Sequence, residues 1–478
     1  MSRSYGFRQR VSRHHVHDGW MVALAATLVV GVWLGPHLHI VLVLAAVVGV
    51  GLVVRMQVAV FGIAAVLLLV GAVLGERAWA QAHPRQLGDY TGWAQVVADP
   101  APFGRGLRLT VEVQHERFDA WLYGARRNLP AQYQVGEFVW VQGRRTPVRG
   151  NWRRAALRHV VGGFDVDVLA DRDRGSAVTR ASNRVRARLR QAAEATMPSA
   201  EAALFAGLVI GDDAREPPWL VQAFRRSGLS HLTAVSGQNV GYTLIAAMPL
   251  LRRLRPWPRW ATTVALIVWF MALTRFEPSV LRAGFMAVLA ATAHVRGQQA
   301  SPIRLLALAV VLLVALDPLL VWSVGFWLSV SATAGVCQVA PWFVPRLPGP
   351  LWLRLPLAVT LGAQVGVALP SLLVFHRVPL VSVPANLAAV PVAGAVMLYG
   401  IPSGLVAPAL PGVLQHVLML PNSLGTRWVA TVARVAAAVE PSPGWGIAGW
   451  GLIVGGIAGH RWVHVRTRSR LVPPGVPS

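Results

Sequence analysis

From residue 232 to residue 459 the chain is a succession of apolar runs, and most approach the roughly 20 residues that a transmembrane helix needs. Of the 478 residues in the whole chain, 54% are hydrophobic and only 14% are charged. This composition is typical of a polytopic α-helical membrane protein and excludes an ordinary soluble enzyme. We expect spanning or buried helices over residues 232–251, 260–273, 280–295, 303–316, 322–340, 355–375, 380–399, 404–420 and 444–459.

The charge of the chain predicts its orientation and its partners. All 45 basic residues are arginine, and against 20 acidic residues they give a formal net charge of +25. The missing lysine fits a compositional bias, whereas an excess of this size indicates contact with anionic lipid headgroups or nucleic acid. The positive-inside rule makes residues 1–18 and 461–478 basic cytoplasmic tails. Residues 19–75 then form N-terminal transmembrane helices and residues 231–460 a second transmembrane domain, so we expect a multi-pass protein of the cytoplasmic membrane.

Residues 76–180 show a different pattern, in which apolar and polar residues alternate over short blocks. Such blocks, separated by turn residues, predict the strands of a small β domain on the outer face of the membrane. Five short strands favour a closed barrel of the OB type. The predicted strands are residues 93–97, 107–113, 118–123, 138–148 and 164–169.

Barrels of this type often bind single-stranded nucleic acid through basic and aromatic side chains. The candidate DNA contacts of the outer domain are Arg108, Trp121, Tyr123, Arg144 and Arg145. The alternative is an ordinary β domain whose aromatic rings form its core. The sequence leaves both interpretations open.

Residues 181–230 are expected to form amphipathic, interfacial helices. Over residues 182–197 an apolar face lies opposite a basic one, so this helix either lies on lipid or forms a basic collar around a pore entrance. The following loop carries Asp212 and Asp213, which could bind a divalent ion or act as acid and base, although helix capping is the commoner role. The basic face of the helix consists of Arg184, Arg186, Arg188 and Arg190.

The stretch SGLSHLTAVSGQNV, residues 227–240, places polar side chains and glycines at the edge of the second apolar region. Backbone that leaves the helix at membrane depth is tolerated only where it is buried in protein or lines a watery cavity. We therefore predict a broken helix with a polar path beside it. The residues expected to line this path are His231, Ser236, Gln238, Asn239, Arg282 and Asn386.

Arg282 needs a compensating partner, because an unpaired arginine inside a membrane is costly. Asp317 is the candidate partner, although an Asp-Pro pair more often marks the end of a span.

An ordered series of motifs over about residues 199–391 resembles the ComEC-type competence family, the inner-membrane channels of bacterial DNA uptake. The series reads LFAGLVIGDD, FRRSGLSHLTAVSGQNV, EPSVLRA, LDP, GFWLSVSAT and VPANLAAVP. The β domain before it looks like the outer domain of that family. The resemblance implies import of a single DNA strand, with the polar path residues acting as hydrogen-bonding groups and not as catalysts.

The sequence also departs from that family. Many members carry a metallo-β-lactamase-type domain, whereas this sequence holds no HxHxDH motif and no GxxxxGK[ST] nucleotide loop. We therefore expect a form without the nuclease domain that is not an enzyme and uses no cofactor or metal. A cytoplasmic ATP-dependent DNA motor and a separate nuclease are the implied partners, and a homo-oligomer is compatible with the sequence. The single cysteine, Cys337, excludes an intramolecular disulfide.

Two other functions compete with the DNA channel. A secondary transporter of a small anionic solute needs ion-coupling carboxylates within its spans, and Asp317 is the one candidate. An intramembrane hydrolase would use Ser230 or Ser236 with His231, but no acid is evident to orient the histidine. The channel is the main prediction and the transporter its alternative.

Overall fold

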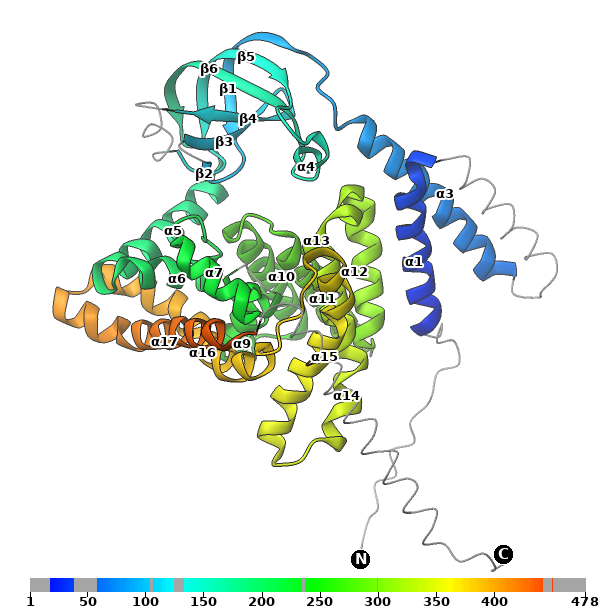
Figure 1. Ribbon diagram of the computed structural model, residues 1–478, viewed down its shortest axis with the longest axis vertical. Helices are drawn as coiled ribbons and strands as arrows, with labels where there is room; N and C mark the ends of the chain where they lie inside the picture. Colours follow the sequence, from blue (N-terminus) through cyan, green and yellow to red (C-terminus); the bar gives the residue numbers. More distant parts are fainter. Residues whose placement is uncertain are drawn as a thin grey trace, which may run out of the picture.

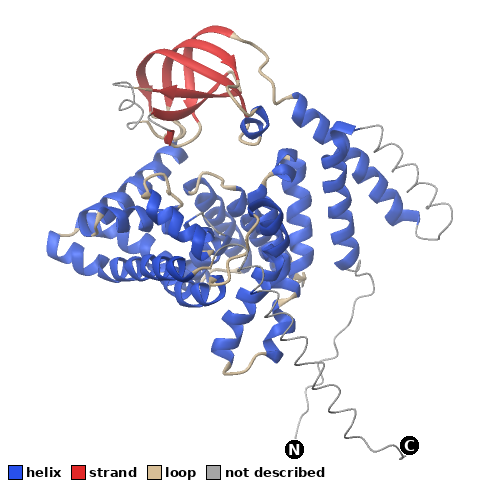
Figure 2. Ribbon diagram, in the orientation of Figure 1, coloured by secondary structure: helices blue, strands red, loops and turns tan. Residues whose placement is uncertain are grey.

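The computed structural model describes residues 18–37, 58–103, 106–123, 133–233, 237–298, 300–441 and 449. A β domain lies above a body of helices, and a helical hairpin stands beside that body (Figure 1). The strands are confined to the β domain, and the remaining described elements are helices and loops (Figure 2). This arrangement agrees with a helical membrane protein that carries an inserted β domain.

The hairpin before the β domain is held together by glycines. Its elements are α1 (Asp18–Leu34), η1 (Gly35–His37) and α3 (Val58–Ala80). A Cβ atom at Gly31 would fall closer than 3.0 Å to the carbonyl oxygen of Leu68, and one at Gly75 would do the same at Val32. Small residues let membrane helices approach to backbone contact, so these glycines set the spacing of the hairpin. Residues 38–57, which fall within the predicted N-terminal transmembrane helices, lie outside the described residues.

The β domain is a six-stranded mixed sheet in the order β1-β5-β6-β4-β3-β2, and β1 also pairs with β3. Every pair is antiparallel except β4 with β6. All five predicted strands are present, whereas β2 is too short to show an alternating pattern in the sequence. The strands are β1 (Gly88–Val96), β2 (Ala101–Phe103), β3 (Gly106–Val113), β4 (Glu116–Leu122), β5 (Phe138–Pro147) and β6 (Val160–Asp173).

The inward side chains of the longer strands form one apolar core. Phe118 and Phe164 are fully buried there, with ring centroids 6.5 Å apart at 66°. Gly162 leaves room for the first ring, because a Cβ atom there would fall closer than 3.0 Å to Phe118. The core therefore uses phenylalanine, while Tyr123 is 57% exposed and contributes nothing to it.

The helical body begins at the end of the β domain. Its first helices surround the broken segment predicted from the sequence. They are α5 (Ala177–Thr196), α6 (Ser199–Ile210), α7 (Pro218–Ser227), α8 (Ser230–Thr233) and α9 (Gly237–Leu251), whereas the short helix α4 (Trp152–Ala156) belongs to the β domain. The later ones are α10 (Pro256–Leu273), α11 (Pro278–Val295), α12 (Pro302–Leu316), η4 (Pro318–Trp322), α13 (Val324–Gln338), α14 (Ala340–Phe343), η5 (Val344–Arg346), α15 (Leu351–Phe375), α16 (Ser382–Val406), η6 (Ala407–Ala409) and α17 (Gly412–Val439).

Five helical segments of the described chain are long and apolar enough to cross a membrane. The largest apolar core of the helical body joins α5, α6, α7, α9, α10, α16 and α17, so it lies around the broken segment. The five segments are Gly62–Ala80, Pro278–Val295, Val324–Arg346, Leu351–Phe375 and Ser382–Ala409.

Two boundaries differ from the sequence predictions. Helix α3 continues to Ala80, past the expected domain end at residue 75. The predicted segment 404–420 is replaced by the end of α16, the short helix η6 and the start of one long continuous helix, α17. Pro421 lies inside α17, where the sequence pattern suggested an end, so its local preference is overridden by packing.

Candidate functional site

The helix between α7 and α9 is broken, as the sequence predicts. Helix α7 ends at Gly228, whose φ of 75° is in the left-handed region that favours glycine. The four-residue helix α8 follows, and α9 begins at Gly237. His231 and Gln238 are exposed on this segment, whereas Ser236 lies outside the described residues. The break thus presents polar groups beside the main apolar core.

Asn239 fixes the start of α9 to a neighbouring helix. Its side chain is 3% exposed, and its amide nitrogen Nδ2 donates to the carbonyl oxygen of Leu208 at 3.1 Å. Leu208 lies in the last turn of α6, whose carbonyls have no partner within the helix. Asn239 therefore supports the shape of the broken segment from inside the protein.

Arg282, in α11, also lies close to the start of α9. It is 7% exposed, and its Nε donates to Oγ of Ser329 at 2.8 Å. A Cβ atom at Gly237 would lie 3.1 Å from its Nη2, so the guanidinium packs against the start of α9. No carboxylate of the described chain forms an ion pair with Arg282. The charge is thus placed beside the break without an acidic partner.

The predicted pair of Arg282 with Asp317 is wrong. Asp317 lies at the end of α12, where its carboxylate accepts a hydrogen bond from the Leu319 backbone and contacts Nε2 of His159 at 3.0 Å. It therefore marks the end of a helix, the commoner role of an Asp-Pro pair, and it contacts the β domain. Asn386 is buried within α16 and donates to the carbonyl oxygen of Ser382 at 2.7 Å, one turn earlier.

The candidate DNA contacts of the β domain are divided between its surface and its interior. Arg108 and Trp121 are cross-strand partners and are half-buried, whereas Tyr123 and Arg144 are exposed. Arg145 is only 8% exposed, bonds to Gln114 and lies 5.4 Å from the ring centroid of Tyr90. Because neighbours along a strand point to opposite faces, Arg144 and Arg145 cannot share one surface. Arg145 is therefore a poor ligand contact.

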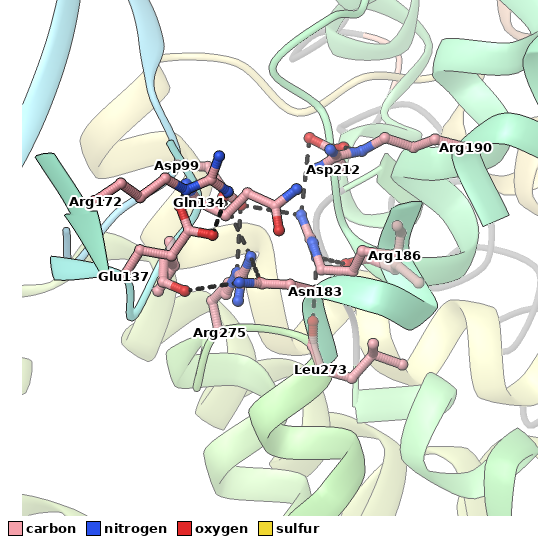
Figure 3. Close-up of polar contacts among 12 residues, drawn as sticks. Asp99, Gln134, Glu137, Arg172, Asn183, Arg186, Arg190, Asp212, Leu273 and Arg275 are labelled. Carbon is pink, nitrogen blue, oxygen red and sulfur yellow. Dashed lines mark hydrogen bonds and ion pairs between the residues drawn. The ribbon is translucent and has the colours of Figure 1, made fainter. Parts of the chain in front are cut away.

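A cluster of charged side chains joins the β domain to the helical body, and Arg186 is its centre (Figure 3). Its Nη1 donates to the carbonyl oxygens of Ile210 at 3.0 Å and Leu273 at 3.1 Å. Its Nη2 donates to Oδ2 of Asp99 at 3.0 Å. Arg186 is 2% exposed, which corrects its expected place on the basic outer face of α5.

Further arginines complete this cluster. Arg275 contacts Asp99 at 3.3 Å and donates to Oδ1 of Asn183 at 2.8 Å, while Arg190 is paired with Asp212. Burial by itself raises the pKa of Asp99, but the guanidinium groups of Arg186 and Arg275 outweigh it and hold that pKa below its ordinary value. The carboxylate is therefore ionised at neutral pH and binds two arginines at once.

Three other carboxyl groups near this cluster have a raised pKa, in contrast to Asp99. Burial, followed by the charges of Asp213 and Asp212, raises the pKa of Glu216 to about 8. Burial also raises the pKa of Asp213 and of Glu277. Within the described chain no three acidic, histidine or cysteine side chains are grouped so as to hold a metal ion. Burial thus favours the protonated form of these three carboxyls.

Sequence reasoning missed Asp99 and Arg275 as members of this cluster. Asp99 precedes Pro100, a pair that indicates a turn, and Arg275 occupies a left-handed position with φ of 61° after α10. The two residues are 176 positions apart in the chain. Only the positive φ of a non-glycine residue marks Arg275 as unusual, and that signal is visible in the structure alone.

These features define a class: a helical membrane protein with a β domain, in which a polar break in one helix lies beside a buried arginine. The chain belongs to the Competence protein family, whose model matches residues 208–463, more than half of the sequence. That match includes α9, Arg282 and Asn386, whereas the β domain lies before it.

Two curated relatives are similar to this chain. Uncharacterized protein YcaI of Escherichia coli (strain K12) is 27% identical over 208 residues, which cover 40% of this chain and 27% of that protein. ComE operon protein 3 of Bacillus subtilis (strain 168) is 27% identical over 200 residues, which cover 41% of this chain and 25% of that protein. The matched part thus amounts to about a quarter of each relative. No solved structure matches this chain.

Proposed function

We propose that this protein imports single-stranded DNA through the cytoplasmic membrane during natural competence. The observation that carries the proposal is the broken segment between α7 and α9, which lies beside Arg282 within the part that matches the Competence family. Arg282 has no carboxylate partner among the described residues, so its charge is available to a phosphate. An unneutralised arginine in this place would otherwise be costly.

The β domain would receive the strand as an OB-like barrel. Its pairing supports this proposal, because β1 pairs with β5 on one side and β3 on the other. The series β1-β5-β6-β4-β3 thus returns to its first strand, which is the condition for closure. Arg108, Trp121, Tyr123 and Arg144 would contact the bases and phosphates.

The path through the membrane part would begin at the break. His231 and Gln238 are exposed there and offer hydrogen bonds, while Asn239 holds α9 in place through α6. The proposal assigns no catalytic step to this chain. A cytoplasmic ATP-dependent motor would supply the driving force, and a separate nuclease would supply the single strand.

Uptake in a naturally competent host tests this proposal. A strain whose copy is deleted should still capture labelled DNA outside the membrane but should take none of it into the cytoplasm. The deletion is then complemented with Arg282→Met, which keeps much of the side-chain volume and removes the charge. Because no described carboxylate pairs with Arg282, the variant leaves no opposite charge uncompensated, so we expect a folded protein without uptake. Normal uptake in the deletion strain or with Arg282→Met would contradict the channel.

A proton-coupled transporter of a small anionic solute is the second candidate function. The carboxyl of Glu216, whose pKa burial raises to about 8, favours it, because such a transporter needs a group that binds and releases a proton near neutral pH. The two functions differ in their ligand. Protein in nanodiscs that fails to bind single-stranded DNA at low salt would favour the transporter.

A further inference from the structure

We infer that Asp99, held by Arg186 and Arg275, is the positioning contact that fixes the β domain over the broken segment. The inference rests on the proposed function, because the β domain is taken as the part that receives DNA. Asp99 lies in the connection between β1 and β2, while Arg186 lies in α5 and Arg275 follows α10. One carboxylate thus joins the β domain to two separate parts of the helical body.

The contact is built to be rigid on the side of the helical body. The side chain of Arg186 is 3% exposed, and one of its nitrogens binds the end carbonyls of both α6 and α10, at Ile210 and Leu273. These carbonyls lack partners within their own helices, so the guanidinium caps two helices at once. Its Nη2 donates to Oδ2 of Asp99 at 3.0 Å and also lies 3.8 Å from Oδ1 of Asp212. Because these contacts already hold the guanidinium in place, the pair with Asp99 forms with little further loss of side-chain freedom.

The same contact leads to the broken segment through α6. Arg186 binds the carbonyl oxygen of Ile210, and two residues earlier the carbonyl oxygen of Leu208 accepts the hydrogen bond from Asn239. Asn183 adds a parallel connection, because its amide donates to the carbonyl oxygen of Val135 in the β domain at 3.1 Å. The end of α6 is therefore shared between the β domain and the start of α9.

A further contact between the β domain and the helical body, from His159 to Asp317, is more exposed to water. His159 meets Asp317 at 3.0 Å, but the two side chains are 44% and 27% exposed. Pairs that face water on both sides contribute little. The side chains of Arg186 and Arg275 are only 3% and 15% exposed, whereas Asp99 itself is 24% exposed, so removal of Asp99 takes a carboxylate away from two largely buried arginine charges. Loss of the Asp99 carboxylate should therefore free the β domain to move about its remaining contacts, while each part keeps its own fold.

Distance measurements between paired spin labels test this inference on the full chain in nanodiscs. With Cys337→Ala as background, labels are placed at Asp167→Cys on β6 and Gln222→Cys on α7, both exposed positions. The parent should give one narrow distance distribution, and Asp99→Asn should broaden it. The matched control is Asp89→Asn, because Asp89 is exposed and pairs with Arg144 inside the β domain. The control should leave the distribution narrow.

Two further variants separate a positioning role from a general loss of stability. Asp99→Glu keeps the carboxylate and should retain the narrow distribution, whereas Arg275→Gln removes a partner from the other side and should broaden it. Asp99→Asn should also bind single-stranded DNA as the parent does, yet lose uptake in the complemented host. An unchanged distribution in Asp99→Asn overturns the inference. Failure of the parent itself to bind DNA would instead overturn the proposed function.

Discussion

Glu216 is the residue whose ionisation should be most visible in the stability of the protein. It is 9% exposed, and its Oε1 has no hydrogen-bond partner among the described residues. It packs against Gly207, with Asp213 and Asp212 as the charged groups nearby. Its pKa of about 8 lies far above the ordinary value of 4.5, because burial penalises the charged form.

The variant Glu216→Gln should therefore remove a pH dependence. Between pH 4.5 and about 8 the folded protein keeps a proton that the unfolded chain has lost, so the free energy of unfolding falls as pH rises through this window. Glutamine resembles the protonated acid, so the variant should match the parent near the lower limit and unfold at a higher temperature above the upper one. Thermal unfolding in nanodiscs across this range measures the difference.

The control is Glu194→Gln, on the exposed end of an ion pair with Arg215. It should follow the pH dependence of the parent. A parent whose unfolding temperature does not change between the two limits would show that Glu216 is ionised in the folded protein.

At this scale the sequence predicts residue classes better than residue partners. The sequence singles out Asn239 and Arg282 as candidate functional residues, because polar side chains within an apolar region are costly unless they have partners. It places Arg186 on an exposed basic face, since a helical pattern cannot show that the ends of α6 and α10 meet that face. The prediction that Arg145 is a surface contact for DNA is missed for a similar reason, because its burial depends on the register of β5 with its neighbours. Such partners come from segments far apart in the chain.

Single elements were predicted more reliably, because their signals are local. Alternation located the five longer strands, and Gly228 with Gly237 located the break between α7 and α9. The continuous helix α17 was not foreseen, since Pro421 weakens the local helical signal. Contacts of α17 with α16 and α7 bury Met419, Asn422 and Thr426 on both sides of that proline, so packing maintains the helix.

Two glycines of α3 give a prediction at the scale of the element. Alanine is favoured over glycine in a helix by up to about 1 kcal/mol, so Gly62→Ala should stabilise the protein slightly, because nothing lies within 4 Å of its Cβ position. Gly75→Ala should destabilise it by about 1–3 kcal/mol, because the new methyl group would collide with the backbone of α1 at Val32. Unfolding in mild detergent measures both changes.

The opposite signs of these two changes are the test. If Gly75→Ala proved as stable as Gly62→Ala, α1 and α3 would not be in backbone contact. The hairpin would then be spaced by side chains and not by its glycines.

The sequence predicts the order of the hairpin, the β domain and the helical body along the chain, but it does not predict how the β domain contacts the helical body. The switch from apolar runs to alternating blocks places the β domain between two helical regions, as observed. The docking depends on Asp99, which reads as an ordinary turn residue. A change of composition along the sequence reveals a domain boundary. The contacts of an interface join residues that are far apart in the sequence, so no local pattern reveals them.

Capture of DNA by the whole molecule provides the last prediction. With a net charge of +25, binding of single-stranded DNA should weaken steeply as salt rises, by a slope of roughly 0.7 per phosphate contact. Arg144→Gln should lower that slope by about one contact, because Arg144 is exposed on β5. Tyr123→Ala should cost about 1–3 kcal/mol of binding at every salt concentration, because stacking on a base involves no counterion release.

Titrations of the full chain in nanodiscs with labelled single-stranded DNA give both quantities. Arg149→Gln is the matched control, since Arg149 is also exposed but forms a short ion pair with Asp165 at 2.7 Å, whereas Arg144 lies 3.7 Å from Asp89. If all three variants changed only the overall affinity by the same factor, the β domain would act as a diffuse positive surface. A slope change confined to Arg144→Gln and a salt-independent loss confined to Tyr123→Ala would place the strand across β4 and β5, because only a bound strand separates charge from stacking in this way.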